Sequence, residues 1–210
     1  SAALLGGRIF VPGGRTDAGQ VTNRMEVYDP EADTWTVAAS LPISLSAYAL
    51  TAFEGQLYLF GGWDGMRFVT TTYAYDPGRD AWTARTPMST ARGYAGAVVA
   101  DGKIFVVGGT DGQQDLTANE EYVPSKDNNG KGSPWTARAP LPAGRRGVGV
   151  VAVTNIVYVI GGAEERSAPF KYNVRDDRWE EFEAPTAGIW RSMGVGMIDT
   201  KIYAVGGWDG

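Results

Sequence analysis

The sequence predicts an all-β fold made of repeated four-stranded sheets, and three observations support that prediction. Short apolar runs end in a glycine doublet five times, at intervals of 48, 47, 53 and 45 residues. After the doublets, a Tyr-to-Trp spacing of seven residues recurs. Glycine supplies 29 of the 210 residues, twice the ~7% that is usual, as expected for a chain dense in turns. A period close to 50 residues is typical of one blade of a β-propeller, which is therefore the predicted architecture.

Each repeat is expected to begin with a strand of small residues that turns tightly into the next strand. These first strands are predicted at Tyr48–Phe53, Tyr94–Ala100, Gly147–Val153 and Met193–Ile198. Glu54-Gly55, Asp101-Gly102 and Asp199-Thr200 are the tight turns that follow three of them, and Asp-Gly is a common hairpin turn. In the first repeat, which starts at about Leu4, the first strand is predicted to be a stub.

The apolar runs are the second strand of each repeat. Their last glycines are Gly14, Gly62, Gly109, Gly162 and Gly207. Glycine allows backbone angles and close approaches that other residues avoid, so we expect the doublets where sheets crowd around the propeller axis. Pro12 lies late in the first run, and because proline cannot donate to a ladder, we expect weak pairing there.

The recurrent Tyr and Trp predict the third and fourth strands. The segments are Y-D-P-E-A-D-T-W at 28–35, Y-D-P-G-R-D-A-W at 75–82 and Y-N-V-R-D-D-R-W at 172–179. Asp and Pro between the two aromatics favour a turn. The remaining copy runs from Tyr122 to Trp135, an interval of 13, which predicts a surface insertion in the hairpin turn. The aromatic side chains are expected to fill the wedge between neighbouring sheets.

Glycine doublets followed by Tyr and, seven residues later, Trp resemble the kelch repeat over essentially the whole chain. The resemblance implies a single kelch-type β-propeller domain over residues 1–210, with approximate blades at 1–40, 41–88, 89–140, 141–185 and a partial blade at 186–210. About four and a half blades are visible, and kelch propellers commonly have six or seven. The chain also begins at Ser1 without Met. We therefore expect an excerpt of a longer ring, completed by further blades or by self-association.

The composition excludes several kinds of chemistry. The chain has no Cys and no His, so thiol catalysis, disulfides and thiolate metal sites are absent, together with the commonest general base. A net charge of −5 argues against a nucleic-acid partner. No apolar run reaches the ~18 residues of a membrane span, so no membrane insertion is expected. We predict no catalytic residue, metal or cofactor.

A candidate binding face follows from the antiparallel strand order. The loop after each glycine doublet (the doublet loop) and the loop leading into the next repeat (the return loop) should emerge on one face. The residues predicted to bind ligand there are Trp63, Asp64, Arg92, Tyr94, Asp111, Arg145, Arg146, Trp190 and Arg191. The arginines from three repeats would surround one mouth of the channel and attract a carboxylate, a phosphate or an acidic peptide. Alternatively, they bond neighbouring loop carbonyls and carboxylates such as Asp64 or Asp111.

The predicted function is a non-catalytic binding module for a protein segment or a glycan. The resemblance implies this, because kelch propellers mostly serve as interaction scaffolds. Replacing Arg92 and Arg145 together is expected to abolish binding with little change in melting temperature. Two alternatives stay open: an enzyme similar to a sialic-acid mutarotase, and a purely structural segment of a larger secreted protein. The resemblance favours a bacterial secreted or cell-envelope location.

Overall fold

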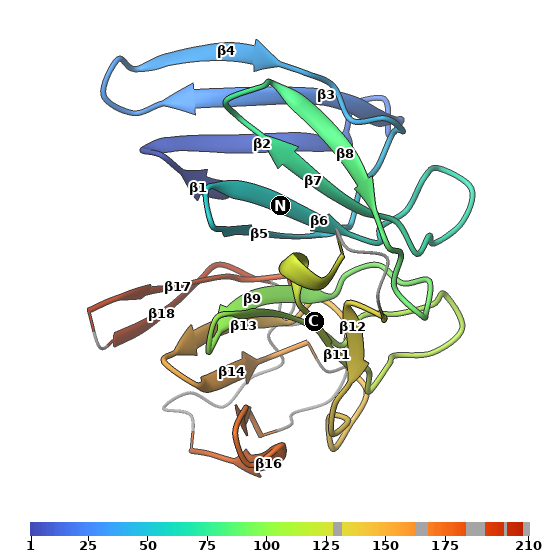
Figure 1. Cartoon of the computed structure of the whole chain (residues 1–210), viewed down its shortest axis with the longest axis vertical. Coiled ribbons are helices and arrows are strands. Elements are labelled where there is room, and N and C mark those ends of the chain that lie inside the picture. The colour runs from blue at the N-terminus through green and yellow to red at the C-terminus, as the bar shows by residue number, and fades with distance from the viewer. Residues whose placement is uncertain (128–131, 163–167, 184–191, 200, 208–210) are drawn as a thin grey trace. The chain divides into compact units, whose positions relative to one another are not determined.

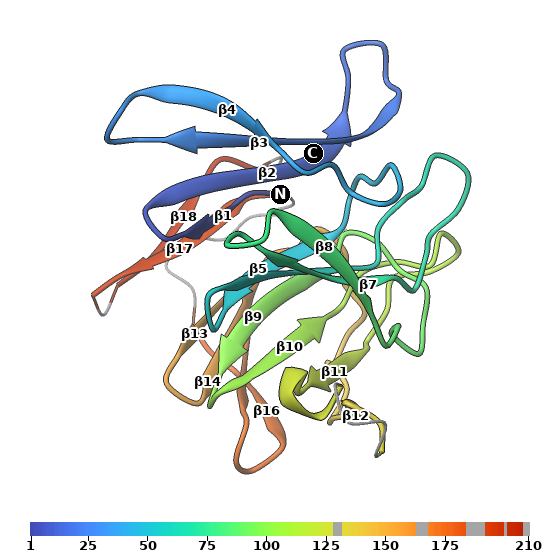
Figure 2. The same ribbon diagram turned by 45° about the horizontal axis from the view of Figure 1, so that its top comes forward.

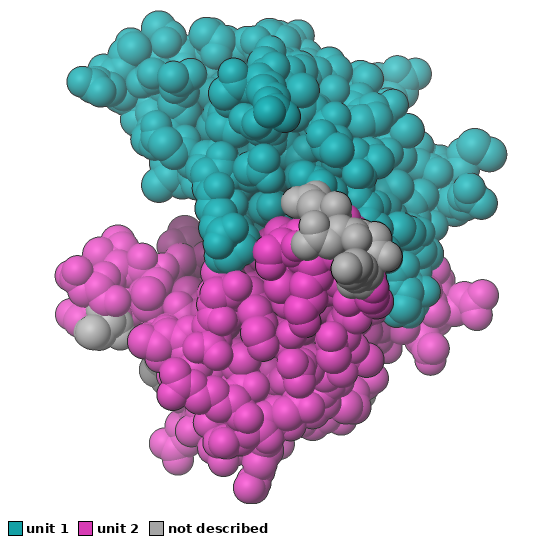
Figure 3. Space-filling model, in the orientation of Figure 1, with its two compact units in different colours: residues 1–93 teal, residues 94–210 magenta. Residues whose placement is uncertain are grey.

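The computed structural model describes residues 1–127, 132–162, 168–183, 192–199 and 201–207, and almost all its regular structure is antiparallel sheet (Figure 1). The chain divides into two compact units, residues 1–93 and 94–210 (Figure 3). No helix in the described part is long and apolar enough to cross a membrane.

Unit 1 contains two four-stranded sheets whose strands are ordered as they occur in the chain. The first sheet comprises β1 (Ala3–Leu5), β2 (Arg8–Arg15), β3 (Val21–Asp29) and β4 (Thr34–Ala38). The second comprises β5 (Ala49–Phe53), β6 (Gln56–Phe60), β7 (Thr72–Asp76) and β8 (Ala81–Arg85).

Unit 2 repeats this arrangement, as the turned view in Figure 2 shows. The third sheet comprises β9 (Gly96–Ala100), β10 (Lys103–Val107), β11 (Asn119–Tyr122) and β12 (Trp135–Ala137), with a 3₁₀ helix, η1 (Pro124–Lys126), between the last two strands. The fourth comprises β13 (Gly149–Val153), β14 (Ile156–Ile160), β15 (Phe170–Asn173) and β16 (Arg178–Glu181). The fifth has two strands, β17 (Gly194–Ile198) and β18 (Lys201–Val205).

The strand order predicted for each repeat is confirmed, with small differences at the strand starts. β5, β9, β13 and β17 begin one or two residues later than predicted. The cause is a left-handed residue before each of them: Ala47, Tyr94, Gly147 and Ser192 have φ of 54°, 55°, 64° and 55°. In the first sheet, β1 is the predicted stub, and the β2–β3 pairing shifts register between Pro12 and Gly14. The insertion before Trp135 contains η1, and residues 128–131 of it lie outside the described part.

The apolar core of each unit lies between its successive sheets. In unit 1, Phe10 and Met25 of the first sheet pack with Leu57 and Tyr75 of the second. In unit 2, the cluster between the third and fourth sheets contains Phe105, Val107, Val157, Val159 and Tyr172. Burying one such side chain stabilises the fold by about 1.5–3 kcal/mol. Tyr75 and Tyr172 fill wedges between sheets as predicted, whereas Tyr28 of the first sheet is only half-buried and Trp35 is 60% exposed.

A recurrent polar clasp joins neighbouring sheets. The Tyr75 hydroxyl donates to Asp80 Oδ1 (2.7 Å), and the same oxygen accepts from the Ala39 backbone N–H of the preceding sheet's exit (2.8 Å). The Trp82 indole N–H donates to the Ala39 carbonyl (2.9 Å). In unit 2, Tyr172, Asp177 and Trp179 hold the backbone of Ala139 in the same way. The repeated Tyr, second Asp and Trp are therefore one device that fastens a sheet to its predecessor.

The clasp predicts that the protein loses stability in acid. The Ala39 N–H and the Tyr75 hydroxyl lower the pKa of Asp80 below its usual value. A depressed carboxyl pKa stabilises the fold above about pH 4, and this contribution disappears as the pH falls through the folded-state pKa. We expect Asp80→Asn to lower the urea midpoint at pH 7. The difference in urea midpoint between the variant and the wild type should narrow below pH 4. Asp33→Asn is the control, because Asp33 accepts from Tyr28 (2.7 Å) on the exposed surface of the first sheet. If the difference in urea midpoint between Asp80→Asn and the wild type did not change with pH, the ionised Asp80 carboxylate would not be stabilising the clasp.

The doublet glycines adopt backbone angles that other residues avoid, as expected, and the first glycine of each of the first three doublets leaves no room for a Cβ because a carbonyl of the next return loop lies against it. A Cβ on Gly61 would lie 2.2 Å from the carbonyl oxygen of Arg92, and one on Gly108 would lie 2.6 Å from that of Arg145. In the first three doublets the second glycine donates to that return-loop carbonyl: Gly14 N lies 2.7 Å from Leu45 O, Gly62 N 2.9 Å from Arg92 O and Gly109 N 2.7 Å from Arg145 O. The doublet therefore holds the backbone of the following return loop in place, by close packing of the first glycine and a hydrogen bond from the second.

Candidate functional site

Two predicted site residues, Asp64 and Asp111, organise their own doublet loops. Asp64 Oδ1 accepts the backbone N–H groups of Met66 and Arg67, both at 2.8 Å. Asp111 Oδ1 accepts those of Gln113 (2.8 Å) and Gln114 (2.9 Å). These hydrogen bonds, led by the one from Arg67 in the first loop and from Gln114 in the second, lower the pKa of both carboxyl groups. Both side chains are ionised turn-formers that hold the loop in shape.

Trp63 connects the doublet loop to the return loop of unit 1. Its backbone pairs with Ser46, with Ser46 N 2.9 Å from Trp63 O and Trp63 N 2.7 Å from Ser46 O. Its ring meets the Phe68 ring edge-on, with centroids 5.1 Å apart. Both aromatic residues are half-buried, whereas Met66 in the same loop is 87% exposed.

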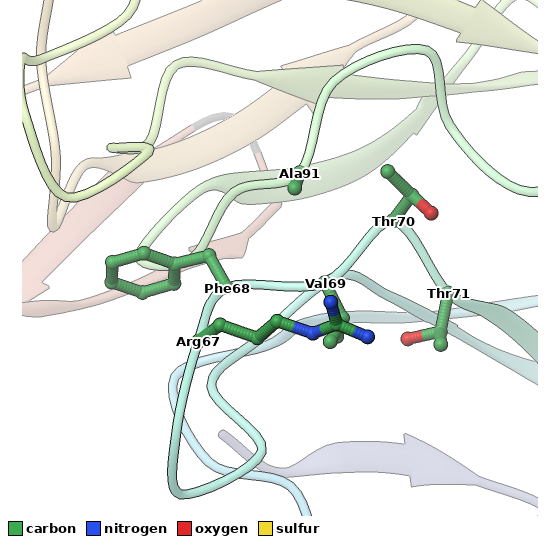
Figure 4. A pocket seen from close by; sticks show the side chains of 6 residues that line it. All are labelled: Arg67, Phe68, Val69, Thr70, Thr71 and Ala91. Carbon is green, nitrogen blue, oxygen red and sulfur yellow. The ribbon is translucent and has the colours of Figure 1, made fainter.

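A pocket of about 320 Å³ opens next to this aromatic pair (Figure 4). Its lining residues are Arg67, Phe68, Val69, Thr70, Thr71 and Ala91. Two backbone bonds shape it, from Met88 N to Thr70 O (2.9 Å) and from Arg92 N to Val69 O (3.3 Å). Figure 4 shows the Arg67 guanidinium reaching along the loop toward Val69 and Thr71, while the Phe68 ring points the other way. We refer to this feature as the Arg67 pocket.

The sequence places Arg67 in a doublet loop of the candidate binding face, but Arg67 is not among the residues predicted to bind ligand. Its side chain is 82% exposed, and its Nε lies 3.9 Å from Asp64 Oδ2. The available signal was its place three residues after Asp64, within reach of that carboxylate. The pocket itself depends on the approach of Ala91, a contact that no local pattern shows.

Arg92 and Arg145 are buried rather than presented at the surface. Arg92 is 1% exposed and Arg145 is 0% exposed. Arg145 donates to the carbonyls of Gly161 (3.2 Å) and Ala168 (2.7 Å), and its guanidinium lies 4.4 Å from the centre of the Phe170 ring. Burial lowers the pKa of Arg145, with Glu181 acting in the opposite direction. These positions favour the interpretation in which the arginines bond loop carbonyls.

This burial changes the expected outcome of replacing Arg145. We expect Arg145→Met to lower the unfolding free energy by about 2 kcal/mol, because the partly buried carbonyls of Gly161 and Ala168 lose their charged donor. The neighbouring Arg146 is the matched control: its side chain is 40% exposed and its Nη1 lies 3.3 Å from Asp115 Oδ1, so Arg146→Met should cost less than about 1 kcal/mol. Chemical unfolding of both variants tests this. Equal, small losses would show that the buried guanidinium does not hold the loop ends.

The remaining predicted residues are dispersed. Tyr94 is 42% exposed and has a left-handed backbone, and its carbonyl accepts from Gly147 N (2.8 Å). Trp190 and Arg191 lie outside the described residues. Arg92 belongs to unit 1 and Arg145 and Arg146 to unit 2, so the arginine ring at one channel mouth stays a prediction. The structure brings Trp63 and Asp64 together in unit 1, and there they adjoin the Arg67 pocket.

The chemistry available in the Arg67 pocket is that of recognition. One exposed guanidinium, two threonine side chains and the apolar groups of Phe68, Val69 and Ala91 can seat a carboxylate beside an apolar group. Within the described ranges, no group of three or more Asp and Glu side chains is arranged to hold a metal ion.

Comparison with known proteins agrees with this architecture. The domain model described as the KLHDC2/KLHL20/DRC7 Kelch-repeats domain matches residues 1–207. Kelch-like protein 35 of Mus musculus is 28% identical over 205 residues, which are 98% of this chain and 26% of that protein. Alpha-scruin of Limulus polyphemus is 44% identical over 55 residues, which are 26% of this chain and 6% of that protein. The matched segments thus span about a quarter or less of these relatives.

A solved structure of YjhT superimposes with a TM-score of 0.84, covering 99% of this chain and 76% of that one. At 15% sequence identity, this likeness concerns the fold alone. Together with the sheets described above, it confirms the predicted all-β, kelch-type propeller class.

Proposed function

This chain belongs to the kelch-repeat family, and from that premise we propose that it is a non-catalytic module that binds a segment of a partner protein. The observation that carries the proposal is the Arg67 pocket, where an exposed cation stands beside the Trp63–Phe68 pair on the predicted loop face. Membership of the family supports binding rather than catalysis, and the chain has no Cys or His to serve as nucleophile or base.

The pocket favours a short segment that combines a carboxylate with an apolar side chain. An arginine guanidinium can bind a carboxylate through two parallel hydrogen bonds. The Asp64 turn fixes the backbone from which Arg67 projects, so part of the ordering cost is met before binding. Exposed Met66 adds an adaptable apolar contact at the rim. The ligand class follows from this pairing of charge and apolar surface.

Selection from a random-peptide phage library on the wild-type protein tests the proposal. We expect enriched peptides to contain Asp or Glu next to an apolar residue. Their affinity, measured by fluorescence polarisation, should fall about tenfold or more in Arg67→Ala. Arg79→Ala is the matched control, because Arg79 lies 3.7 Å from Asp76 in the same three-residue relation and is 85% exposed. That variant should bind within about twofold of the wild type.

The outcomes separate the competing functions. Equal binding by wild type and Arg67→Ala, or equal loss in both arginine variants, would remove the Arg67 pocket as the site. The enzymatic alternative has its own assay, in which anomerisation of N-acetylneuraminic acid is followed by NMR. Acceleration over buffer that Arg67→Ala abolishes would replace the binding proposal with a catalytic one.

A further inference from the structure

The doublet loops that follow β6 and β10 share one pattern of backbone hydrogen bonds, both within the loop and to the return loop. The bonds run from Val69 N to Gly62 O, Met88 N to Thr70 O and Arg92 N to Val69 O in unit 1, and from Leu116 N to Gly109 O, Leu141 N to Thr117 O and Arg145 N to Leu116 O in unit 2. Phe68 and Asp115 also correspond, because each pairs with the residue that follows its doublet. Ala91, which precedes Arg92, therefore corresponds to Gly144, which precedes Arg145.

The return loop of unit 2 packs more closely on its doublet loop than an alanine would allow. A Cβ on Gly144 would lie 2.3 Å from the carbonyl oxygen of Asp115 and 2.8 Å from its carbonyl carbon. These are backbone atoms, so no side-chain rotation would relieve the contact. Unit 1 has Ala91 at this position, and its methyl group keeps the return loop farther from the carbonyl of Phe68. Ala91 and Phe68 both line the Arg67 pocket, so the pocket lies where the two loops are kept apart.

The Phe68 ring does not fill the space between the loops, because it packs on Gly93. A Cβ on Gly93 would lie 2.5 Å from Cε1 and 2.7 Å from Cδ1 of Phe68, so the ring rests directly on the glycine backbone. Figure 4 shows the ring pointing away from the Arg67 guanidinium. In unit 2 the corresponding residues, Asp115 and Arg146, form an ion pair at 3.3 Å instead. The contact between Phe68 and Gly93 thus leaves an apolar space open, whereas the same position in unit 2 carries paired charges.

We propose that Ala91 is a positioning residue whose methyl group holds the two loops apart, so that the Arg67 pocket can take a bulky apolar side chain, such as Leu, of the bound segment. The apolar groups of Phe68, Val69 and Ala91 line the pocket, and apolar walls favour an apolar ligand group. Because folded proteins pack closely, a return loop without this methyl group closes onto Phe68 as it does onto Asp115 in unit 2. The choice of ligand rests on the proposed function, whereas the spacing of the loops does not.

A thiol placed in the pocket measures its opening without any ligand. The chain has no Cys, so Thr71→Cys on the pocket wall (Figure 4) supplies a single reactive group. In this background we expect Ala91→Gly to slow alkylation by iodoacetamide about fivefold or more, because access limits the reaction of a thiol. Ala91→Ser retains the Cβ, as does Ser44 at the corresponding position of the first repeat, and should react within about twofold of the parent. Melting temperatures show that both variants are folded. An Ala91→Gly rate equal to or above the parent rate would overturn the spacing role.

The reciprocal change in unit 2 separates loop spacing from a general effect of substitution. Ala118 occupies the position of Thr71, since each accepts a hydrogen bond from the first glycine of its doublet (2.8 Å). In an Ala118→Cys background, Gly144→Ala should raise the alkylation rate about fivefold or more, because the new Cβ must push the return loop off Asp115. An unchanged rate in a folded Gly144→Ala protein would contradict the proposal. If Gly144→Ala does not fold, the rates of the two Ala91 variants decide the question.

The ligand part of the proposal is tested with a peptide selected on the wild type that requires Arg67, and with its analogue in which the apolar residue is Ala. Ala91→Gly should weaken the selected peptide about tenfold and the Ala analogue less than about twofold, so that the loss follows the apolar side chain. If Arg67→Ala abolishes binding while Ala91→Gly binds both peptides like the wild type, the proposed function stands and the role of Ala91 is overturned. If no peptide requires Arg67, the proposed function fails, and the alkylation rates alone decide the spacing role.

Discussion

Gly61→Ala is expected to lower the unfolding free energy by about 3 kcal/mol or more. A left-handed backbone costs an alanine about 1–2 kcal/mol, and Gly61 has φ of +60°. The added Cβ would also lie 2.2 Å from the Arg92 carbonyl oxygen. The return loop must then move, at a further cost of about 1–3 kcal/mol. Because Gly62 N donates to that same carbonyl, its hydrogen bond is weakened together with the packing.

Gly55 supplies the control for this prediction. It has φ of +76°, and a Cβ there would meet nothing within 4 Å. Gly55→Ala therefore carries only the backbone cost of about 1–2 kcal/mol. Urea unfolding followed by tryptophan fluorescence compares the two variants, and Gly108→Ala with Gly102→Ala repeats the comparison in unit 2. If Gly61→Ala and Gly55→Ala were equally destabilising, the doublet would not be seating the return loop.

Arg138→Met is expected to cost about 3 kcal/mol, because it leaves a buried carboxylate with weaker compensation. The Glu121 side chain is 3% exposed, and its Oε2 accepts from Arg138 Nη2 (2.7 Å) and Nε (3.0 Å) and from Lys103 Nζ (3.1 Å). The expected loss of unfolding free energy is at the low end of the about 3–5 kcal/mol typical of a broken buried ion pair, because Lys103 still donates to Glu121. Burial opposes the charge on Arg138, but the hydrogen bond to Glu121 and the negative charges of Glu121, Tyr172 and Asp177 together outweigh it and raise the pKa of the guanidinium.

Two comparisons keep this prediction specific. Lys171→Met breaks the pair between Lys171 and Glu180 (3.3 Å), whose side chains are 38% and 52% exposed, and should cost less than about 1 kcal/mol. The double variant Glu121→Leu with Arg138→Met removes both charges and should recover most of the lost stability. Chemical unfolding measures all three. A double variant no more stable than Arg138→Met would show that packing, rather than the stranded charge, explains the loss.

The repeat architecture could be predicted from the sequence because its signals are local and recur. A doublet, a Tyr and a Trp at fixed spacing identify three strands in each of the first, second and fourth sheets without knowledge of tertiary contacts. The group that crowds the doublets could not be predicted, since the carbonyl against Gly61 belongs to Arg92, 31 residues later.

The candidate site was less predictable than the fold. Arginine is usually a surface residue, so the burial of Arg145 against Phe170 carries no sequence signal. The Arg67 pocket requires Ala91 to approach the doublet loop, and a single sequence does not show that contact. Trp35, Trp82 and Trp179 each follow a repeated Tyr by seven residues, so the sequence does not distinguish them. The 60% exposure of Trp35 depends on what covers its sheet.

The binding role of the Arg67 pocket is tested most directly by mapping a selected peptide on the wild-type protein by NMR. Backbone amide shifts are expected to be largest at residues 66–71 and 88–92, which form the pocket and its floor, and negligible at the 76–80 turn that carries Arg79. Saturable shifts confined to those two segments would establish the site. Shifts centred on the 110–115 loop or on the face of another sheet would contradict it.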